Sequence, residues 1–249
     1  LLDKVKRRLF VYTDMERSPE DKNGKNGMLE GDSSIAAAYL MLYEITGEMD
    51  YLRYAEKQFQ KVEDLCGQSD DYMGGGAGQL LLSLKLYKNI GNKRYIELAK
   101  RYEKELWEHS FIAVKGVGWK TCDGPPLAGM AHGSSGILMA YAELLRVTGE
   151  KTYEEKIRQI LAYENFLYSK KYGNWLDLRV PGEIRVMNAW CHGAPGILLA
   201  RMKLEEAGVQ TEKDIRLAAA ALFTQNPAAH MCLCHGAAGN LLIMNRYLS

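Results

Sequence analysis

A glycine-rich turn followed by an apolar helix recurs five times along the chain, and this repeat limits the possible folds more than any other feature. Aligned on one glycine of each turn, the copies follow one another every 43 to 60 residues, which leaves room for two helices and two loops in each. Repeats of this length are supersecondary units that stack on their neighbours, and the unit here is a helical hairpin. The aligned glycines are Gly31, Gly75, Gly133, Gly193 and Gly236.

The first helix of each hairpin is predicted to be buried and the second to be amphipathic. After four of the turns, the apolar helix is followed by a polar break with a glycine, which is a helix C-terminal signal. Segments after the breaks, such as Tyr51–Leu65 and Tyr95–Trp107, carry apolar residues at three- and four-residue spacing with charged residues between them. We therefore expect an inner layer of first helices wrapped by an outer layer of second helices. The predicted first helices are Ile35–Ile45, Gln79–Ile90, Ile137–Val147 and Ile197–Ala207.

These layers predict an all-α fold, and closure of the layers would give an α/α toroid, or barrel, of helical hairpins. An open solenoid of hairpins is the alternative. Closure is favoured because the unusual residues share one register of the repeat and would then converge at one mouth of the ring. Five recognisable repeats, the last cut short, predict an incomplete copy, so we expect residues 1–249 to be a single toroid domain from a longer protein.

Composition excludes several classes of partner. The 32 Lys and Arg residues are balanced by 31 Asp and Glu residues, so no broad field attracts nucleic acid or anionic lipid. Apolar runs such as Leu217–Phe223 fall short of the roughly 20 residues of a membrane-spanning helix, and the first residues carry no signal-peptide pattern. An odd number of cysteines, five, fits a reducing compartment. We therefore expect no nucleic-acid partner, no membrane span and a cytoplasmic location.

The residue before the aligned glycine is histidine in three of the five repeats. The chain has only five histidines, so three at equivalent sites are unlikely to be scattered by chance, and equivalent loops are predicted to present imidazoles to a common centre. A structural role is the simpler interpretation for the other two, His109 and His230. The residues at this register are Glu30, Gly74, His132, His192 and His235.

Two cysteines beside this register complete a candidate metal site. Cys191, Cys234 and His235 are strong zinc ligands, and three protein ligands leave the fourth tetrahedral position open, as in catalytic zinc sites. All three stand just before a predicted helix start, where amide groups and the helix dipole favour thiolate over thiol. A structural zinc site is the alternative, with Cys232 or Cys122 as a fourth ligand. The Cys232-Leu-Cys234 spacing is tighter than the two-to-four-residue spacing usual in structural sites.

The sequence around these residues resembles the lanthionine synthetase C-like cyclases. The resemblance rests on His-Gly-x-x-Gly at His132, on Trp-Cys-His-Gly-Ala-Pro-Gly at Trp190–Gly196, and on Leu-Cys-His-Gly-x-x-Gly-Asn at Leu233–Asn240. In motif it is most similar to the cyclase domain of class II lanthipeptide synthetases and to the eukaryotic members. The resemblance implies an α/α toroid with Zn²⁺ at its mouth, held by the residues that match Cys191, Cys234 and His235.

The resemblance also implies a reaction, in which a cysteine thiol adds to dehydroalanine or dehydrobutyrine in a dehydrated precursor peptide and closes a thioether ring. His132 matches the histidine to which proton transfer is attributed, and Asp71 matches a carboxylate that would orient or tune it, although a merely structural role for Asp71 is also open. A dehydratase domain outside this sequence would be a natural fusion partner. One position departs from the pattern: stand-alone cyclases carry an arginine where this chain has Met187, and whether Arg185 replaces it is open.

Three other interpretations remain. The eukaryotic relatives imply addition of glutathione to dehydroamino acids in proteins, which the same zinc and His132 would serve. A protein prenyltransferase β-subunit also has zinc at the mouth of an α/α barrel, but it needs an Asp, Cys and His ligand set, and the paired Cys-His-Gly motifs argue against it. A non-catalytic helical scaffold stabilised by zinc would require four protein ligands.

Overall fold

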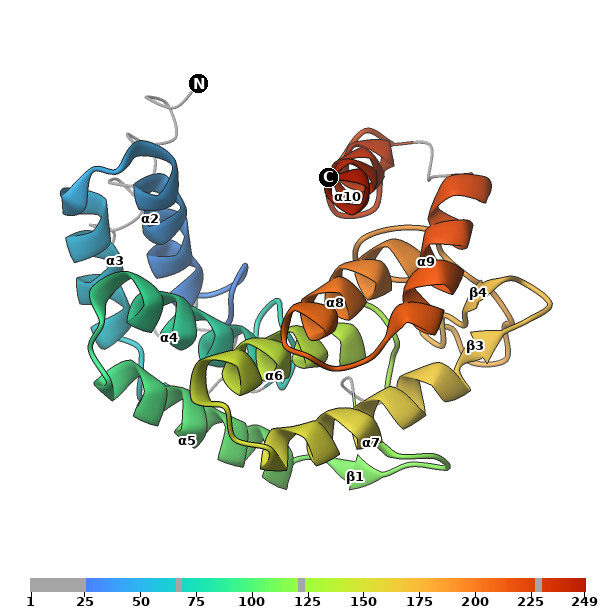
Figure 1. Ribbon diagram of the computed structural model, residues 1–249, viewed down its shortest axis with the longest axis horizontal. Coiled ribbons are helices and arrows are strands. Elements are labelled where there is room, and N and C mark those ends of the chain that lie inside the picture. The colour runs from blue at the N-terminus through green and yellow to red at the C-terminus, as the bar shows by residue number, and fades with distance from the viewer. Residues whose placement is uncertain (1–25, 66–68, 121–123, 227–229) are drawn as a thin grey trace. The chain divides into compact units, whose positions relative to one another are not determined.

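The computed structural model describes residues 26–65, 69–120, 124–226 and 230–249, and consecutive helices form pairs along the chain (Figure 1). The contacts of the chain divide it into two compact units, Leu1–Glu103 and Lys104–Ser249. Each unit is described below by itself. The single domain over 1–249 stays a prediction.

The first unit is built on two helical hairpins. Helix α2 (Ser33–Thr46) packs against α3 (Met49–Gln60) and α4 (Gly76–Ile90), and α5 (Arg94–Glu108) follows α4 and runs across the unit boundary. Helices α2 and α4 end at glycines in the left-handed conformation, Gly47 and Gly91, each of which donates its N–H to a carbonyl in the last turn. The predicted glycine stop signals are therefore confirmed here.

The second unit contains five helices among the described residues: α6 (Ser134–Thr148), α7 (Thr152–Phe166), α8 (Ala194–Glu206), α9 (Glu212–Thr224) and α10 (Ala237–Leu248). Helix α6 contacts α7 and α8, α8 contacts α9, and α10 contacts both α8 and α9. In Figure 1, α6 and α8 lie side by side with α7 and α9 outside them. Most side chains of α6 are buried and most of α7 are not, as predicted for inner and outer helices.

Two short hairpins of strands join these helices, and the sequence did not predict them. Strand β1 (Phe111–Ile112) pairs with β2 (Val117–Gly118), and β3 (Tyr168–Ser169) pairs with β4 (Asn174–Trp175), both antiparallel. Trp175 at the end of β4 is 1% exposed and joins a core cluster with residues of α8 and α9. The second hairpin thereby fixes the start of the long loop that leads to Cys191.

The all-α class and the helix positions are confirmed, with one helix shorter than predicted. Helix α3 ends at Gln60, whereas the apolar spacing predicts helix to Leu65. Side-chain amides explain the difference: Asn26 donates to the carbonyls of Val62 and Leu65, and Gln79 also donates to Leu65, at 2.9 to 3.2 Å. No helix among the described residues has both the length and the apolar character needed to cross a bilayer.

Candidate metal and acid–base site

Three of the repeated turns lie edge to edge in the second unit. The Ala131 N–H donates to the Cys191 carbonyl at 3.1 Å, and the Cys191 N–H donates to the Cys234 carbonyl at 3.1 Å. These two hydrogen bonds join the turn that carries His132 to the turn of Cys191, and that turn to Cys234. The predicted convergence of equivalent loops is confirmed for these three turns.

Glycine makes this close approach possible. Gly193 has a φ of 98°, and a Cβ there would lie 1.6 Å from the Met187 carbonyl oxygen. Gly129 has a φ of 105°, and a Cβ there would lie 2.8 Å from the Cys191 carbonyl oxygen. Any other residue at either position would need a strained backbone. A Cβ at Gly193 would collide within the loop of Cys191, and one at Gly129 would push this loop away from the turn of His132. The backbone of these turns therefore sets the distance between the His132 turn and the Cys191 turn.

The side chains of Cys191, Cys234 and His235 form a compact cluster, with one ligand atom of each lying within 4.8 Å of the others. Cys191 is buried, Cys234 is half-buried and His235 is exposed. Ligand atoms around one tetrahedral Zn²⁺, with bonds of about 2.0–2.3 Å, stand roughly 3.5–3.8 Å apart. The three side chains thus fit one zinc ion if their ligand atoms approach one another by at most about 1.3 Å. With only three ligands, the donor set leaves a fourth position for another molecule.

The two thiols influence each other strongly. Burial raises the pKa of Cys191 to about 12, helped by the charge of Cys234 and by a hydrogen bond between the two side chains. The effect of the helix N-terminus expected from the sequence is therefore outweighed at Cys191 by burial. A nearby cation is what would hold two thiolates together in this position.

Of the two alternative ligands for a structural zinc site, Cys232 does not join the cluster. Cys232 is half-buried, and its sulfur accepts the backbone N–H of His235 at 3.4 Å. Among the described residues, the group that could hold a metal contains Cys191, Cys234 and His235 without Cys232. Cys122, the other candidate, lies outside the described residues.

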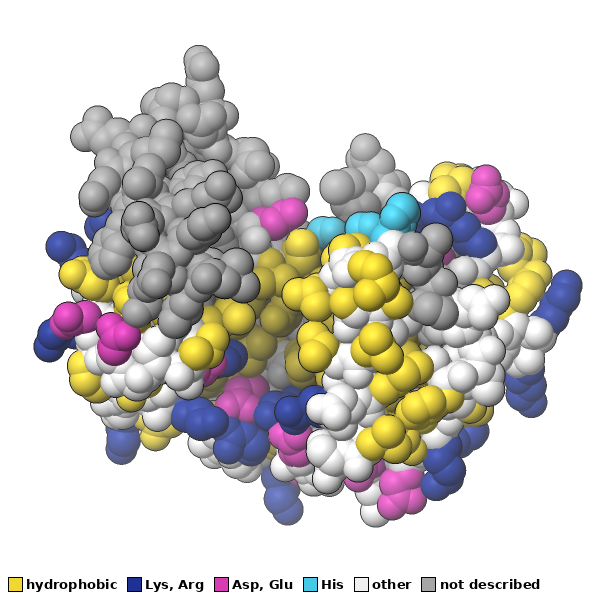
Figure 2. Space-filling view, turned by 90° about the horizontal axis from the view of Figure 1, so that it is seen from above, with side chains coloured by type: hydrophobic (Ala, Val, Ile, Leu, Met, Phe, Trp, Pro, Cys, Tyr) yellow, Lys and Arg dark blue, Asp and Glu magenta, His cyan; other side chains and the backbone are white. Residues whose placement is uncertain are grey.

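Two imidazoles stand next to one another beside this cluster. The ring centroids of His132 and His192 are 6.2 Å apart, and His192 is only 3% exposed, whereas His132 is half-buried. The pKa of His192 is lowered to about 4, mainly by burial and also by the positive charge of Arg179. His192 is therefore uncharged at neutral pH. Figure 2 shows histidine side chains gathered on one face of the molecule, with Lys or Arg side chains beside them.

Arg179 is a site residue that the sequence analysis missed. Its guanidinium donates two hydrogen bonds to the buried carboxylate of Asp177, at 2.9 and 2.7 Å, and its Nη2 lies 3.3 Å from the Met187 sulfur. The bond to Asp177 raises the pKa of Arg179, and so do the charges of Cys191 and Cys234. Arg179 therefore brings a positive charge close enough to interact with both thiols. The cluster of charged residues before the Trp-Cys-His-Gly motif could have indicated in the sequence that an arginine lies near the site.

Arg185, whose role the sequence left open, is held by the same carboxylate. Its Nε lies 3.3 Å from the Asp177 carboxylate, and its Nη1 lies 3.7 Å from Glu183. Asp177 thus orients two guanidinium groups in the loop before Cys191. The described contacts link Arg179, rather than Arg185, to the charges of the two thiols.

Asp71 lies in the first unit, where its carboxylate holds a turn. It accepts the Ser69 hydroxyl at 2.7 Å and the Gly74 N–H at 2.8 Å. These bonds support the structural role that the sequence analysis left open for Asp71. Its predicted role toward His132 stays a prediction, since the two residues belong to different units.

Comparisons with known proteins agree with this geometry. A family model described as "Lanthionine synthetase C-like protein" matches residues 8–248. The Lacticin 481/lactococcin biosynthesis protein LcnDR2 of Lactococcus lactis subsp. lactis is 28% identical over 256 residues, which cover 96% of this chain and 25% of that protein. The chain thus spans about a quarter of the length of this relative.

Solved structures show the fold. Nisin cyclase matches with a TM-score of 0.55 and 15% identity, over 98% of this chain and 80% of that one. The GH76A alpha-1,6-mannanase from Salegentibacter sp. HEL1_6 matches with a TM-score of 0.60 and 16% identity, over 84% of this chain and 67% of that one. The fold is the α/α toroid that the repeat predicted. Because a mannanase shares this fold, the fold alone does not determine which reaction is catalysed. The side chains of the site have to determine it.

Proposed function

Because the chain belongs to the lanthionine synthetase C-like family, we propose that it carries a zinc-dependent peptide cyclase activity. Cysteine thiols of a dehydrated precursor peptide add to dehydroalanine or dehydrobutyrine and close thioether rings. The observation that carries this proposal is the cluster of Cys191, Cys234 and His235, which brings three zinc-ligand atoms within 4.8 Å of one another.

Each ligand has a definite origin in the repeat. Cys191 comes from the turn before α8, and Cys234 and His235 come from the turn before α10. When bound, a zinc ion supplies the positive charge that lowers the pKa of a thiol and so provides thiolate near neutral pH. The backbone bond from Cys191 to Cys234 keeps the two turns at the spacing that such a ligand set needs.

The proton of the thiol is carried by His132. As the sulfur bonds to the β-carbon, the electrons of the carbon–carbon double bond move toward the α-carbon and its carbonyl, which gives an enolate. His132 takes the proton from the thiol and returns it to the α-carbon, so that one hydrogen is moved and none is lost. His192 is not suited to this role, because its pKa of about 4 leaves it without a proton to give at pH 7.

Arg179 is proposed to stabilise the enolate. A preorganised cation near a developing oxyanion is among the largest contributions to catalysis, and it must be held in place before the reaction. The two hydrogen bonds to Asp177 hold the Arg179 guanidinium in this way. This assignment gives the Met187 position no direct role beyond its contact with Arg179.

The function is tested by counting thiols. The intact protein is incubated with zinc and a dehydrated precursor peptide, and the remaining free thiols are measured with an alkylating agent. The wild type is expected to consume peptide thiols and Cys191→Ala to leave them free. His132→Ala is expected to consume them about 10²–10⁴-fold more slowly, since it loses proton transfer alone. Cys232→Ala is the matched control, because its sulfur lies outside the cluster, and it is expected to keep activity. Thiols that persist with the wild type would refute the proposal for that peptide.

Two alternatives give different outcomes in the same assay. Consumption of added glutathione in preference to peptide thiols would identify the glutathione-adding activity. One bound zinc with no thiol consumption, together with loss of helical signal in Cys234→Ala, would identify a scaffold. A cytoplasmic location, a fused dehydratase domain and the catalytic role of Asp71 stay predictions.

A further inference from the structure

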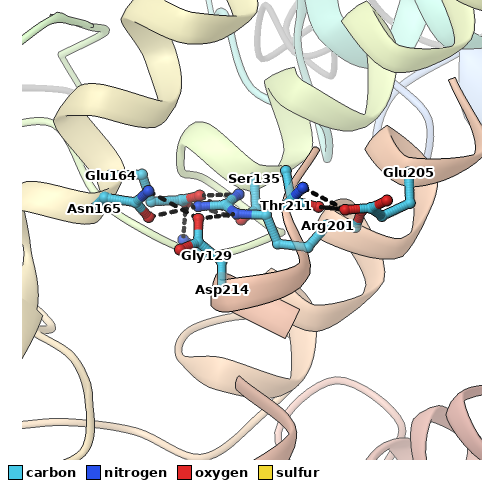
Figure 3. Close-up of polar contacts among 8 residues, drawn as sticks. All are labelled: Gly129, Ser135, Glu164, Asn165, Arg201, Glu205, Thr211 and Asp214. Atoms are coloured by element: carbon cyan, nitrogen blue, oxygen red, sulfur yellow. Dashed lines mark hydrogen bonds and ion pairs between the residues drawn. The ribbon is translucent and has the colours of Figure 1, made fainter. Parts of the chain in front are cut away.

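A fully buried ion pair is bonded to the turn that carries His132. Glu164 on α7 and Arg201 on α8 both have side chains with 0% exposure, and Arg201 Nη1 lies 2.7 Å from Glu164 Oε2. Figure 3 shows these two side chains at the centre of a network that joins four helices. Neither residue has a part in the proposed proton transfer.

The Glu164 carboxylate holds both ends of this turn. Its Oε1 accepts the Gly129 N–H at 3.1 Å, and its two oxygens accept the Ser135 hydroxyl at 2.8 and 3.0 Å. Gly129 is three residues before His132 and Ser135 is three residues after it. We call Gly129–Ser135 the His132 turn. One carboxylate therefore anchors the segment on either side of the imidazole.

Arg201 is in turn held from two more sides. Its Nε lies 3.1 Å from the Asp214 carboxylate, and its Nη2 donates to the Asn165 side-chain oxygen at 3.1 Å. Asn165 also donates to Asp214 at 2.8 Å, which closes the network (Figure 3). Because α8 begins directly after the Cys191 turn, Arg201 links the His132 turn to the helix that supports Cys191.

Two other turns of the chain are held by neutral side chains instead. Asn26 accepts the Ser33 N–H at 2.8 Å, and Asn174 accepts the Ala194 N–H at 3.0 Å. An ionised pair in a dry interior carries a large desolvation cost, and apolar residues of similar volume often replace such pairs without loss of stability. Stability alone therefore does not explain the use of a buried ion pair at the His132 turn. Short charge-assisted hydrogen bonds do, however, fix geometry more tightly than neutral ones.

We propose that Glu164 and Arg201 are positioning residues that hold His132 in the place from which it transfers protons. The inference rests on the proposed function of His132. The carboxylate acts through the backbone of the His132 turn, and the guanidinium holds the carboxylate in its orientation. The hydrogen bond from the Ala131 N–H to the Cys191 carbonyl then couples the position of this turn to that of the thiol cluster.

The first test removes one link while leaving the ion pair intact. Ser135→Ala deletes the hydroxyl that donates to Glu164, and Ser83→Ala is its matched control, because the buried Ser83 hydroxyl donates only to its own helix. We expect Ser135→Ala to lower kcat roughly tenfold at unchanged zinc content, since small misplacements of a catalytic group are costly. Ser83→Ala is expected to leave kcat within about twofold of the wild type.

The second test replaces the whole pair by Glu164→Leu with Arg201→Met, which removes both fully buried charges together. The Asp214 carboxylate, 14% exposed, keeps the Asn165 amide as a hydrogen-bond donor. Amide exchange over Leu127–Ser135 is expected to become about tenfold faster, because the Gly129 N–H loses its acceptor. Exchange over α4 is the internal control. This measurement does not depend on activity, so it stays informative even if the wild type proves not to be a cyclase.

A double-mutant cycle separates positioning from a general structural effect. If the pair acts through His132, then Ser135→Ala lowers kcat in the wild type but not further in a His132→Ala background. Equal losses in both backgrounds would overturn the proposal, as would a Glu164→Leu/Arg201→Met protein with wild-type kcat and wild-type exchange. If that double variant does not fold, the cycle with Ser135→Ala decides the matter alone.

Discussion

At the scale of single residues, His192 shows how burial decides the chemistry of a side chain. It occupies the same register of the repeat as His132 and His235, yet it is 3% exposed and its ring is hydrogen-bonded to the backbone of Ala128. Desolvation disfavours its charged form, so it stays neutral where a half-buried histidine can exchange protons. In the proposed function, the three histidines at this register have three different tasks: proton transfer for His132, a neutral packing role for His192, and metal binding for His235.

The first prediction concerns pH. Because burial lowers the pKa of His192 from 6.5 to about 4, the folded state binds a proton less readily than the unfolded state. The stability that comes from burying a neutral His192 is therefore fully present above pH 6.5 and is lost as the pH falls toward 4. The free energy of unfolding, measured in urea with a chelator present, is expected to drop by up to about 3 kcal/mol over this range. In His192→Gln the drop should be clearly smaller, and an identical drop would contradict the assignment.

The second prediction concerns Arg179. If its guanidinium stabilises the enolate, Arg179→Ala should lower kcat about 10²-fold with little change in KM for the peptide. Arg185→Ala is the matched control, since Arg185 shares the Asp177 carboxylate without the link to the thiol charges. A larger loss in Arg185→Ala than in Arg179→Ala would reverse the two roles.

The residues of the metal cluster could be predicted from the sequence because ligands are recognised by type and by register. Arg179 was missed, although a cluster of charged residues precedes the Trp-Cys-His-Gly motif. Glu164 could not be predicted, because its partner Arg201 is distant in the chain. Glu164 lies in a helix where charged residues alternate with apolar ones, and nothing local distinguishes it from Glu154 or Glu155 near the start of the same helix. Only the three-dimensional structure shows that Glu164 pairs with Arg201, which lies 37 residues further along the chain.

At the scale of elements, the glycines have two separate structural roles. Some end a helix in open space, as Gly208 does with a φ of 84° and no heavy atom within 4 Å of the place that a Cβ would occupy. Others, such as Gly193, combine a positive φ with backbone packed against the missing side chain. The first role demands only a backbone conformation, while the second also lets the Gly193 backbone pack against the Met187 carbonyl of its own loop.

This difference gives the third prediction. Gly208→Ala should cost about 1 kcal/mol of unfolding free energy, because only the left-handed conformation is disfavoured. Gly193→Ala should cost about 3 kcal/mol or more, since a Cβ there would collide with the Met187 carbonyl. Urea denaturation of both variants measures the two costs. Equal costs would show that the Cys191 turn can move apart without penalty.

Most elements could be predicted because the inner helices are strongly apolar and end at glycine. The predicted Gln79–Ile90 and Ile137–Val147 fall inside α4 and α6, each of which starts three residues earlier. The two strand hairpins could not be predicted, since each strand has only two residues and shows no alternation. The end of α3 was missed for another reason, because side-chain amides from other segments donate to the carbonyls of Val62 and Leu65, which follow the helix.

At the scale of the whole molecule, all three candidate zinc ligands belong to one of the two units, that of Lys104–Ser249. They come from two turns that are far apart in the sequence, so a bound ion would close a long loop of this unit. Binding to the folded state alone stabilises it by mass action.

The fourth prediction follows. Zinc at about a thousandfold excess over its dissociation constant should stabilise the protein by roughly 4 kcal/mol. Calorimetry with and without zinc measures the shift, and amide exchange should slow in the second unit while staying unchanged in the first. Cys234→Ala should lose the shift and Cys232→Ala should retain it. A shift that survives in Cys234→Ala would place the metal elsewhere.

The turns before α4, α6 and α10 start their helices with nearly the same backbone, since Gly75, Gly133 and Gly236 all have φ between −121° and −133° with an extended ψ. The residue just before them is a glycine in one case and a histidine in the other two. The same loop conformation is therefore compatible with either glycine or histidine at this position. Copies of such a hairpin can therefore differ in chemistry while sharing one architecture, and a protein engineer could exchange the residue at this position without redesigning the loop.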